Sequence, residues 1–580
     1  MGDRVTVGTL DELRRAGCLT GKAGAQPICV FWSDGGAFAL DDRCPHMGFP
    51  LHRGSVESGL VTCHWHNARF DLASGGTLDP WADDVRSYPV EIEADGRVTV
   101  VVAPDADRRA HLQHRLEEGL EQGVSLVMAK AVLGLLDAGV APAEIVRAGV
   151  AFGTRYKEAG WGSGLTVLTA MANVLPHLDA ADRGLALVQG LAFVSRDTRG
   201  RPPRFPLAPL PGELPAPRLA TWYRRFIDTR SADAAERTLA SAVASSDAAA
   251  VADAMFAAVT DHVFLDGGHT VDFTTKAFEV LDHLGWDQAG EVLPTLVAQT
   301  ASASRSEERG AWQYPHDLAG LIRTAVADLP DRLAAGAGAG ADGFDHDAGV
   351  AALAWSILSD DPHEVVAAID GAIAAGATTE ELGRAVAYAA GLRITRFHTQ
   401  NDHGDWDEVH HAFTAANALH QALVRSPSPE LVRGVYHGAL RIYLDRFLNI
   451  PAARLPSAAP AGGGGSDLDG LQACWDREGQ VDEAGAIVYR YLSAGGDPAR
   501  IIAALGRALL TEDAAFHWFQ TYEAAVRQFG AWPAGSEEGA LILTGTARFL
   551  AAHTPTRREL AQVVSIATRL RRGEALFEEA

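Results

Sequence analysis

Two short segments of this 580-residue chain pair cysteine with histidine, side chains that commonly bind transition metals. The first is Cys44-Pro45-His46 and the second is Cys63-His64-Trp65-His66, with sixteen residues, 47–62, between them. Two thiolates can hold one iron of a [2Fe–2S] cluster while two imidazoles hold the other. Zinc sites use the same residue types. The pattern therefore predicts a metal centre with Cys44, His46, Cys63 and His66 as its ligands.

The surrounding residues favour the iron–sulfur cluster over zinc. Gly48, Leu51 and Gly54 follow the first segment, and the second continues to Asp71 and Gly75 before a Tyr88-Pro89-Val90 strand. On these motifs, residues 3–103 resemble a Rieske ferredoxin domain. The resemblance implies a [2Fe–2S] cluster that passes single electrons.

The residues near the ligands also predict the reduction potential of such a cluster. High-potential Rieske proteins have an additional cysteine pair, and a serine and a tyrosine that hydrogen-bond to the sulfurs. Those positions resemble Phe49, Trp65, Ala68 and Phe70 here. Since none of these supplies a hydroxyl donor, we expect a potential near the low end of the Rieske range, roughly −150 mV.

Length and composition limit the class of protein. A chain of 580 residues is too long for one core, so several domains are expected. The formal net charge of −24 argues against nucleic acid as a partner. The five cysteines show no disulfide spacing, and no apolar stretch could act as a signal peptide or cross a membrane. We expect a cytoplasmic protein that binds no membrane.

Lysine is rare in this sequence. It occurs only at positions 22, 130, 157 and 276, and arginine supplies the other basic side chains. Because the two residue types differ in geometry and hydration, each lysine raises the question of why arginine does not stand there.

The periodicity of the chain changes once. Up to residue 103, short apolar segments alternate with Gly, Asp and Pro turns, which predicts β-strands at 28–32, 37–40, 60–63, 90–93 and 98–102. From about residue 108 to the end, apolar residues recur at helical spacing. The predicted fold class is multidomain: a small all-β domain at 1–103 and a large all-α domain made of two halves, 104–335 and 344–580, which together form one catalytic domain.

The two helical halves have weakly similar segments in the same order, which predicts an internal duplication. Residues 147–151 resemble 384–388, residues 171–175 resemble 416–419, and residues 254–286 correspond to 504–532. In this correspondence, His517 lies near the place that His269 occupies in the first half.

The glycine-rich stretch between the halves requires an interpretation of its own. Gly338-Ala339-Gly340-Ala341-Asp342-Gly343 matches the dinucleotide-binding string, but no predicted strand precedes it. We interpret it as a flexible linker, and residues 461–466 as another. Electrons would then come from an external NAD(P)H-dependent reductase.

In the second half, residues 396–411 are dense in metal-ligand residue types. If a helix starts near His403, then His403, Asp407 and His410 share one face at i, i+4 and i+7, with His411 beside Asp407. Such a face could bind a metal. The alternative is a helix N-terminus capped by aspartate, with the histidines solvated or satisfied in the core.

The first half offers a second set. A helix after Gly267-Gly268 carries His269, Asp272 and Lys276 at i, i+3 and i+7. Lys276 has apolar neighbours, and a buried ammonium must be paired or neutralised. Pairing with Asp272 or Glu279 is therefore the alternative to a ligand role for Lys276.

On residues 401–411 and 269–276, the helical region resembles the questin oxidase-like family. That resemblance implies an all-helical non-haem iron enzyme that oxidises aromatic polyketides, with several histidines and a carbamylated lysine on the iron, which would suit Lys276. Two features depart from the family. Its members generally lack a Rieske domain, and residues 161–168, the first-half equivalent of the histidine helix, contain no histidine.

These observations predict a Rieske-type oxidoreductase, a non-haem iron oxygenase acting with O2 on a small organic molecule such as an aromatic polyketide. The cluster would feed electrons through His46 or His66 to a mononuclear or dinuclear iron. Its candidate ligands are His269, Lys276, His403, Asp407, His410 and His411. The alternative is an electron-transfer or redox-sensing protein whose helical region binds a partner and holds no second metal.

Overall fold

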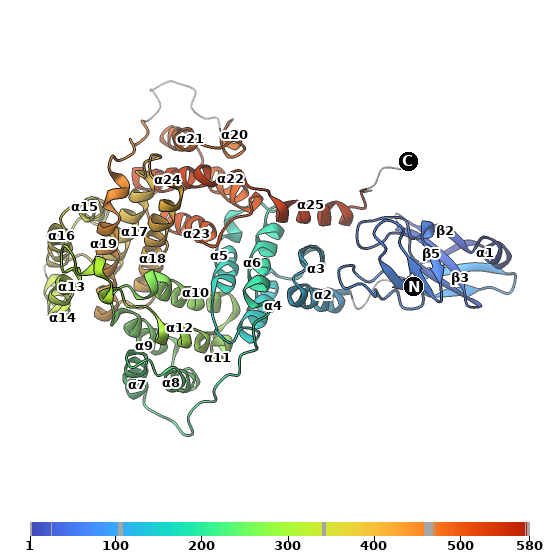
Figure 1. Cartoon of the computed structure of the whole chain (residues 1–580), viewed down its shortest axis with the longest axis horizontal. Coiled ribbons are helices and arrows are strands. Elements are labelled where there is room, and N and C mark those ends of the chain that lie inside the picture. Colours follow the sequence, from blue (N-terminus) through green and yellow to red (C-terminus); the bar gives the residue numbers. More distant parts are fainter. Residues whose placement is uncertain are drawn as a thin grey trace. The chain divides into compact units, whose positions relative to one another are not determined.

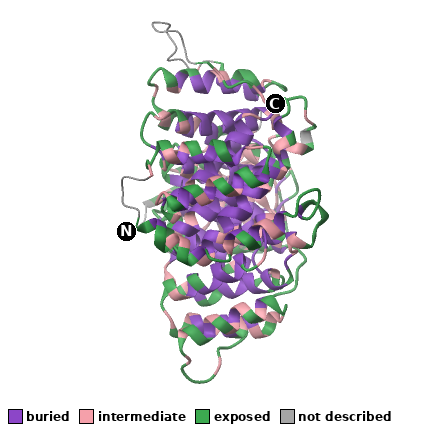
Figure 2. Cartoon of the chain, turned by 90° about the vertical axis from the view of Figure 1, so that its left-hand side faces the viewer, coloured by how far each residue is buried: buried purple, intermediate pink, exposed green. Residues whose placement is uncertain are grey.

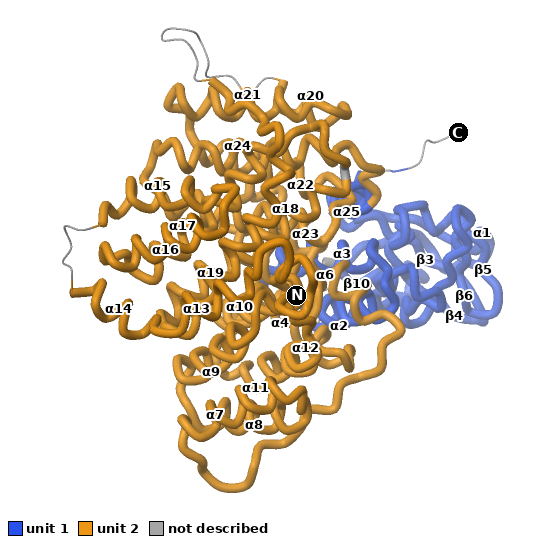
Figure 3. Tube along the Cα trace, turned by 60° about the vertical axis from the view of Figure 1, so that its left-hand side comes forward, with its two compact units in different colours: residues 1–141, 560–580 blue, residues 142–559 orange. Residues whose placement is uncertain are grey.

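The computed structural model describes residues 3–24, 26–102, 108–338, 344–457, 468, 470–574 and 576, without the side chains of Asp3 and His403. The chain divides into two compact units (Figure 3). Unit 1 comprises Met1–Ala141 and Leu560–Ala580, and unit 2 comprises Pro142–Glu559. Among the described residues, no helix combines the length and the apolar character that crossing a membrane would need.

Unit 1 contains antiparallel sheets with the strand orders β1-β10-β9, β2-β3-β4-β8 and β5-β6-β7. Figure 1 draws the strands of this part of the chain in blue. The strands are β1 (Asp3–Thr9), β2 (Cys18–Ala23), β3 (Gln26–Ser33), β4 (Gly36–Asp41), β5 (Ser55–Glu57), β6 (Leu60–Thr62), β7 (Arg69–Asp71), β8 (Ser87–Tyr88), β9 (Val90–Ile92) and β10 (Arg97–Val102). A short helix, α1 (Leu10–Ala16), joins β1 to β2. The predicted small all-β domain at the N-terminal end is confirmed.

The hairpin between β3 and β4 shows how a local signal fixes this fold. Asp34 and Gly35 have φ of 49° and 80°. Positive φ at both central residues is what a tight type I′ hairpin turn requires, and Asp-Gly is a preferred pair there. The turn between the strands predicted at 28–32 and 37–40 is therefore made by Asp34 and Gly35.

Three helices belong to unit 1 with the sheets: α2 (Arg108–Gln122), α3 (Ser125–Asp137) and α25 (Glu559–Arg571), the last from Leu560 onward. These helices make an ion pair of 2.9 Å between Arg571 and Asp137, and one of 2.8 Å between Arg115 and Asp83 in the connection from β7 to β8. By packing, the unit thus extends beyond residue 103, where the sequence places the end of the β domain.

Unit 2 is helical, as predicted for the large C-terminal region. Its first half contains α4 (Pro142–Arg155), α5 (Ser163–Val174), α6 (Arg183–Thr198), α7 (Ala216–Asp228), α8 (Ala232–Ser245), α9 (Ala248–Thr260), α10 (His269–Leu284), α11 (Ala289–Val292), α12 (Val297–Ser302), α13 (Leu318–Val326) and α14 (Leu329–Ala337). Its second half contains α15 (Ala348–Ile357), α16 (Pro362–Ala374), α17 (Thr379–Thr395), α18 (Trp406–Arg425), α19 (Pro429–Leu444), α20 (Leu471–Trp475), α21 (Val481–Ser493), α22 (Pro498–Thr511), α23 (Phe516–Gly530) and α24 (Glu537–His553). Residues 339–343 of the predicted first linker and all of the second, 461–466, lie outside the described residues.

Four helices form the centre of unit 2. Helices α5 and α18 each pack against both α10 and α23. Buried residues concentrate along the middle helices of the unit, and exposed residues along its outer ones (Figure 2). Within the halves, α4, α5 and α6 pack together, as do α17, α18 and α19. These groups contain the first two pairs of segments matched by the predicted duplication, and the third pair lies in α9–α10 and α22–α23. The duplication stays a prediction.

Glycine and alanine allow close approach at this centre. A Cβ atom on Gly268 would lie 2.6 Å from Cβ of Ala415 on α18, and its φ is 96°. Only glycine accommodates both the left-handed backbone and this contact. The start of α10 is thereby held against α18.

Candidate metal centres

The two cysteine–histidine segments form loops of the same design in unit 1. The amides of Cys44 and Cys63 each donate to the carbonyl oxygen five residues further on, at 2.7 and 2.8 Å. Each loop closes on a residue with positive φ, Gly48 at 83° and Asn67 at 63°. Glycine and asparagine adopt this conformation more easily than other residues. The repeated hydrogen bonding gives both loops the same curvature around their cysteine.

The two cysteine sulfurs are neighbours and are almost completely buried. Cys44 and Cys63 are 3% and 1% exposed. The thiol of Cys44 donates to the sulfur of Cys63, which lowers the pKa of Cys63 below its ordinary value. Backbone amides two and three residues along each loop also point at the two sulfurs. These donors stabilise negative charge on sulfur, as metal-bound thiolates require.

The two histidines complete the set. The ring centroids of His46 and His66 lie 4.8 Å apart at an interplanar angle of 85°. Nδ1 of His46 is buried and has no hydrogen-bond partner among the described residues. A buried polar atom without a partner is costly, and an iron of the cluster would supply that partner. The donor set therefore fits a [2Fe–2S] cluster, and the exposed ring of His66 leaves one edge accessible.

Phe49, Trp65, Ala68 and Phe70 occupy the positions where the additional cysteines and the hydroxyl donors of a high-potential cluster are expected. Ala68 and Phe70 are fully buried, and the rings of Phe49 and Trp65 lie 6.1 Å apart. None of the four side chains carries a hydroxyl group. These four residues therefore offer the cluster sulfurs no hydroxyl donor, which is the reason to expect a low reduction potential.

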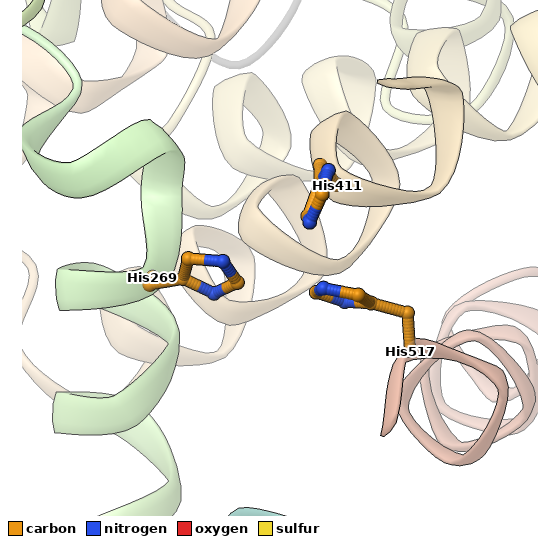
Figure 4. A group of neighbouring side chains, drawn as sticks. All are labelled: His269, His411 and His517. Carbon is orange, nitrogen blue, oxygen red and sulfur yellow. The ribbon is translucent and has the colours of Figure 1, made fainter. Parts of the chain in front are cut away.

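A second group of histidines lies inside unit 2. His269 is the first residue of α10, His411 lies on α18 and His517 is the second residue of α23. One ring nitrogen from each lies within 4.8 Å of the others, and all three residues are half-buried. Figure 4 shows the three rings converging from the three helices. Imidazole ligands in such an arrangement suit iron, zinc, copper or nickel.

His410 adjoins this group on the other side of His517. Its ring stacks on that of His517 at a centroid distance of 4.7 Å, and the residue is 1% exposed. Neither ring nitrogen of His410 makes a hydrogen bond among the described residues. Nε2 lies 3.4 Å from a carboxylate oxygen of Asp407, whose own side chain is 67% exposed. His410 is therefore a buried imidazole that still needs a partner.

Burial keeps these imidazoles neutral. It lowers the pKa of His411 to about 4 and the pKa of His269 below its ordinary value. The pKa values of His410 and His517 are lowered by burial as well, and neighbouring histidines add to the effect. A neutral ring is the form that binds a metal.

The structure thus brings together some of the residues singled out in the sequence. His269 and His411 converge with His517, and His410 adjoins them. The helix expected from His403 begins at Trp406, after a short turn at His403–Asp405, so His403 is not on the helical face that the sequence proposed. Its side chain lies outside the described part of the structure. The sequence links His517 to this group only through the predicted duplication, as the counterpart of His269.

Lys276 lies two turns along α10 from His269 and is 1% exposed. Its Nζ donates to Oε2 of Glu279 at 2.8 Å and to Oε2 of Glu523 on α23 at 2.9 Å. These carboxylates raise its pKa despite burial. A carbamate here would place a further negative charge beside two buried carboxylates, so the contacts favour an ammonium in an ion pair.

Further polar side chains of the four central helices surround this ion pair. Asn173 on α5 donates to Glu279 at 2.7 Å and to Glu523 at 3.1 Å. Gln520 on α23 donates to Asp272 of α10. Burial raises the pKa of Asp272 to about 7. This network links α10 and α23, which carry His269 and His517, with α5. Its members on α5 and α23 could not be paired with α10 from sequence spacing.

Taken together, the β-fold and the paired loops of unit 1 define an iron–sulfur electron-transfer domain. Residues 3–89 match the Rieske [2Fe-2S] domain family. The ferredoxin subunit of a 3-phenylpropionate/cinnamic acid dioxygenase from Photorhabdus laumondii is 36% identical over 80 residues, 13% of this chain and 75% of that protein. Through this domain, the chain belongs to the Rieske family, and its N-terminal domain holds a [2Fe–2S] cluster.

Other relatives show how far the similarity extends. Apoptosis-inducing factor 3 from Mus musculus is 39% identical over 75 residues, 13% of this chain but only 12% of the mouse protein. A 4beta-methylsterol monooxygenase from Methylococcus capsulatus is 35% identical over 80 residues, 21% of its length. Among solved structures, the ferredoxin of carbazole 1,9a-dioxygenase from Nocardioides aromaticivorans is 26% identical over 18% of this chain and 98% of its own, with a TM-score of 0.16.

Proposed function

We propose that this protein is an iron–sulfur oxidoreductase in which the Rieske cluster supplies single electrons to a non-haem iron in unit 2. The observation that carries the proposal is the convergence of His269, His411 and His517 in the interior of a helical unit. Half-buried imidazoles that lie this close, with their pKa values lowered by burial, are arranged as ligands rather than as solvated side chains. His410 is the candidate for a fourth ligand.

The attached Rieske domain and the relatives of this chain support iron and O2 over another metal or reaction. Three imidazoles would also suit zinc or copper, but a covalently attached one-electron donor serves a redox metal. The relatives named as components of dioxygenase systems and as a sterol monooxygenase support an oxygenase role for the whole chain. A small organic molecule, such as an aromatic polyketide, would be the substrate, and an external NAD(P)H-dependent reductase would reduce the cluster.

The residues of this chain would perform distinct tasks. The histidines would hold the iron, and the iron itself would supply the chemistry with O2. The rings of Phe273 and Phe516 lie 5.4 and 6.1 Å from the ring of His269 and would exclude water on that side. The Lys276 ion pair would stabilise the packing of α10 against α23 without taking part in metal binding.

Iron and acid-labile sulfide per chain test this proposal on the full-length protein. A cluster alone gives equal amounts, so the proposal predicts more iron than sulfide. His411→Ala and His517→Ala should each remove the excess iron and leave sulfide unchanged. His420→Ala is the matched control, since His420 is another buried histidine of α18 but hydrogen-bonds to Gln528 instead.

Equal iron and sulfide in the well-folded protein would overturn the second metal. That result would favour the alternative, an electron-transfer or redox-sensing protein whose helical unit binds a partner.

A further inference from the structure

One lysine of unit 1 lies against the first cluster loop. Lys130 is in the middle of α3, and its Nζ donates to the main-chain oxygen of Pro45 and, at 3.1 Å, to that of His46. Pro45 lies between the ligands Cys44 and His46. Helix α3 therefore binds directly to the segment that presents two of the four cluster ligands.

The ammonium group of Lys130 is largely shielded from solvent and lies near one carboxylate. Its side chain is 15% exposed, and Oδ2 of Asp83 lies 3.6 Å from Nζ. Asp83 also forms an ion pair of 2.8 Å with Arg115 of α2. Lys130 thus shares its carboxylate with a second cation, which leaves part of its own charge uncompensated.

Lysine suits the contacts made at position 130 better than arginine would. Lysine occurs at only four positions in the chain. A compact ammonium can direct its three N–H groups at two carbonyl oxygens and a carboxylate, whereas the planar guanidinium of arginine is shaped for a paired acceptor. The two carbonyls of the Pro45-His46 turn point to a single spot, which is where the ammonium lies.

The segment around Asp83 also contacts the ligands. The ring of Trp81 packs edge-on against that of His46, with centroids 4.8 Å apart. Arg115 donates to the carbonyl oxygen of Ala82 at 2.9 Å. Helices α2 and α3 therefore hold both the first ligand loop and the segment that packs on its histidine.

We infer that Lys130 is a positioning residue of the cluster: it anchors the Pro45-His46 turn, and its positive charge raises the reduction potential. Reduction adds one electron, so the cluster with its ligands becomes more negative by one charge. A positive charge held nearby, with little water between, stabilises the reduced form more than the oxidised form. Lys130 thereby counteracts part of the low potential expected from the missing hydroxyl donors.

This inference needs only the Rieske cluster, and it holds whether or not unit 2 binds iron. Its test is a redox titration of the full-length protein, monitored through the absorbance and the electron paramagnetic resonance signal of the cluster. Lys130→Gln keeps a donor but removes the charge, and Lys130→Met removes both. Both variants should have a lower midpoint potential than the wild type. Lys130→Arg, which keeps the charge, should lie closer to the wild type than Lys130→Gln does.

Two further variants complete the test. Asp83→Asn removes a negative charge beside Lys130 and should raise the midpoint potential. Lys157→Met is the matched control, because the side chain of Lys157 is 13% exposed and pairs with Asp197 at 2.8 Å in unit 2. It should leave the potential unchanged.

A midpoint potential equal to that of the wild type in Lys130→Gln would overturn the inference, as would a fall of the potential in Asp83→Asn. If Lys130→Met fails to assemble the cluster, these two variants decide the question.

Discussion

Replacing Lys276 by methionine tests whether this buried lysine is part of an ion pair or a metal ligand. In the structure its ammonium lies 2.8 Å from Glu279 and 2.9 Å from Glu523, and these side chains are 1%, 5% and 1% exposed. Methionine fills a similar volume but leaves two carboxylates without their cation. Removing one partner of a buried ion pair costs about 3–5 kcal/mol.

The side chains around Glu279 and Glu523 determine how much stability Lys276→Met should lose within this range. Asn173 still donates to both carboxylates, and Arg527 remains 3.2 Å from Glu523 and 3.6 Å from Glu279. Arg527 is 36% exposed, so solvent screens its charge and it replaces Lys276 only in part. We expect Lys276→Met to lower the free energy of unfolding of unit 2 by about 3 kcal/mol.

Urea denaturation measured by far-UV circular dichroism gives this value, and cluster absorbance reports unit 1 separately. The double variant Lys276→Met/Glu523→Gln should regain part of the loss, because one unpaired charge is removed with its partner. Iron bound to unit 2 should persist in Lys276→Met. A loss below about 1 kcal/mol would refute the buried ion pair. Loss of iron with stability retained would instead make Lys276 a ligand.

Three further predictions concern the network and the cluster. Because burial raises the pKa of Asp272 to about 7 from an unfolded value near 3.9, the folded protein holds a proton there that the unfolded chain loses. Stability should therefore fall as pH rises from about 4 to 7, and Asp272→Asn should flatten that decline in urea titrations at several pH values; an unchanged slope would contradict the shift. Cys44→Ser should abolish the rhombic signal of the reduced cluster while far-UV circular dichroism stays nearly constant, and a surviving signal would remove Cys44 from the ligands. Ala68→Ser and Phe70→Tyr should each raise the midpoint potential through a new hydrogen bond toward sulfur, and a redox titration without any rise would contradict this.

The cluster ligands could be predicted from sequence because each loop is a local structure. Cys44 and His46 lie in one turn, and Cys63 and His66 in another, so their spacing alone defines the pattern. The sequence could not predict that Lys130 would contact the first loop. That contact depends on how α3 packs on the β domain, and packing between distant segments leaves no local periodicity.

The candidate metal site of unit 2 could be predicted from the sequence only in part. The sequence placed His269 and His411 among the candidate ligands from their density and helical spacing, but the face it proposed depended on a helix start at His403. The helix starts at Trp406, and Asp407 is largely exposed. His517 comes from a helix far along the chain, so only the predicted duplication indicates it.

Lys276 illustrates the same limit in energetic terms. Its apolar neighbours indicated burial, and pairing with Glu279 was open because three residues on a helix lie side by side. Its second partner, Glu523, belongs to α23 and is brought close only by packing of the central helices. Without that second carboxylate, a ligand role and an ion pair were equally compatible with the sequence.

The central claim is that unit 2 binds iron independently of the cluster, and metal analysis of the full-length Cys44→Ser variant tests it most directly. This variant should contain no acid-labile sulfide but should retain a stoichiometric amount of iron, which the additional substitution His517→Ala should remove. A Cys44→Ser protein that is folded, as judged by its helical circular dichroism, and that binds no iron after reconstitution with ferrous iron would contradict the account.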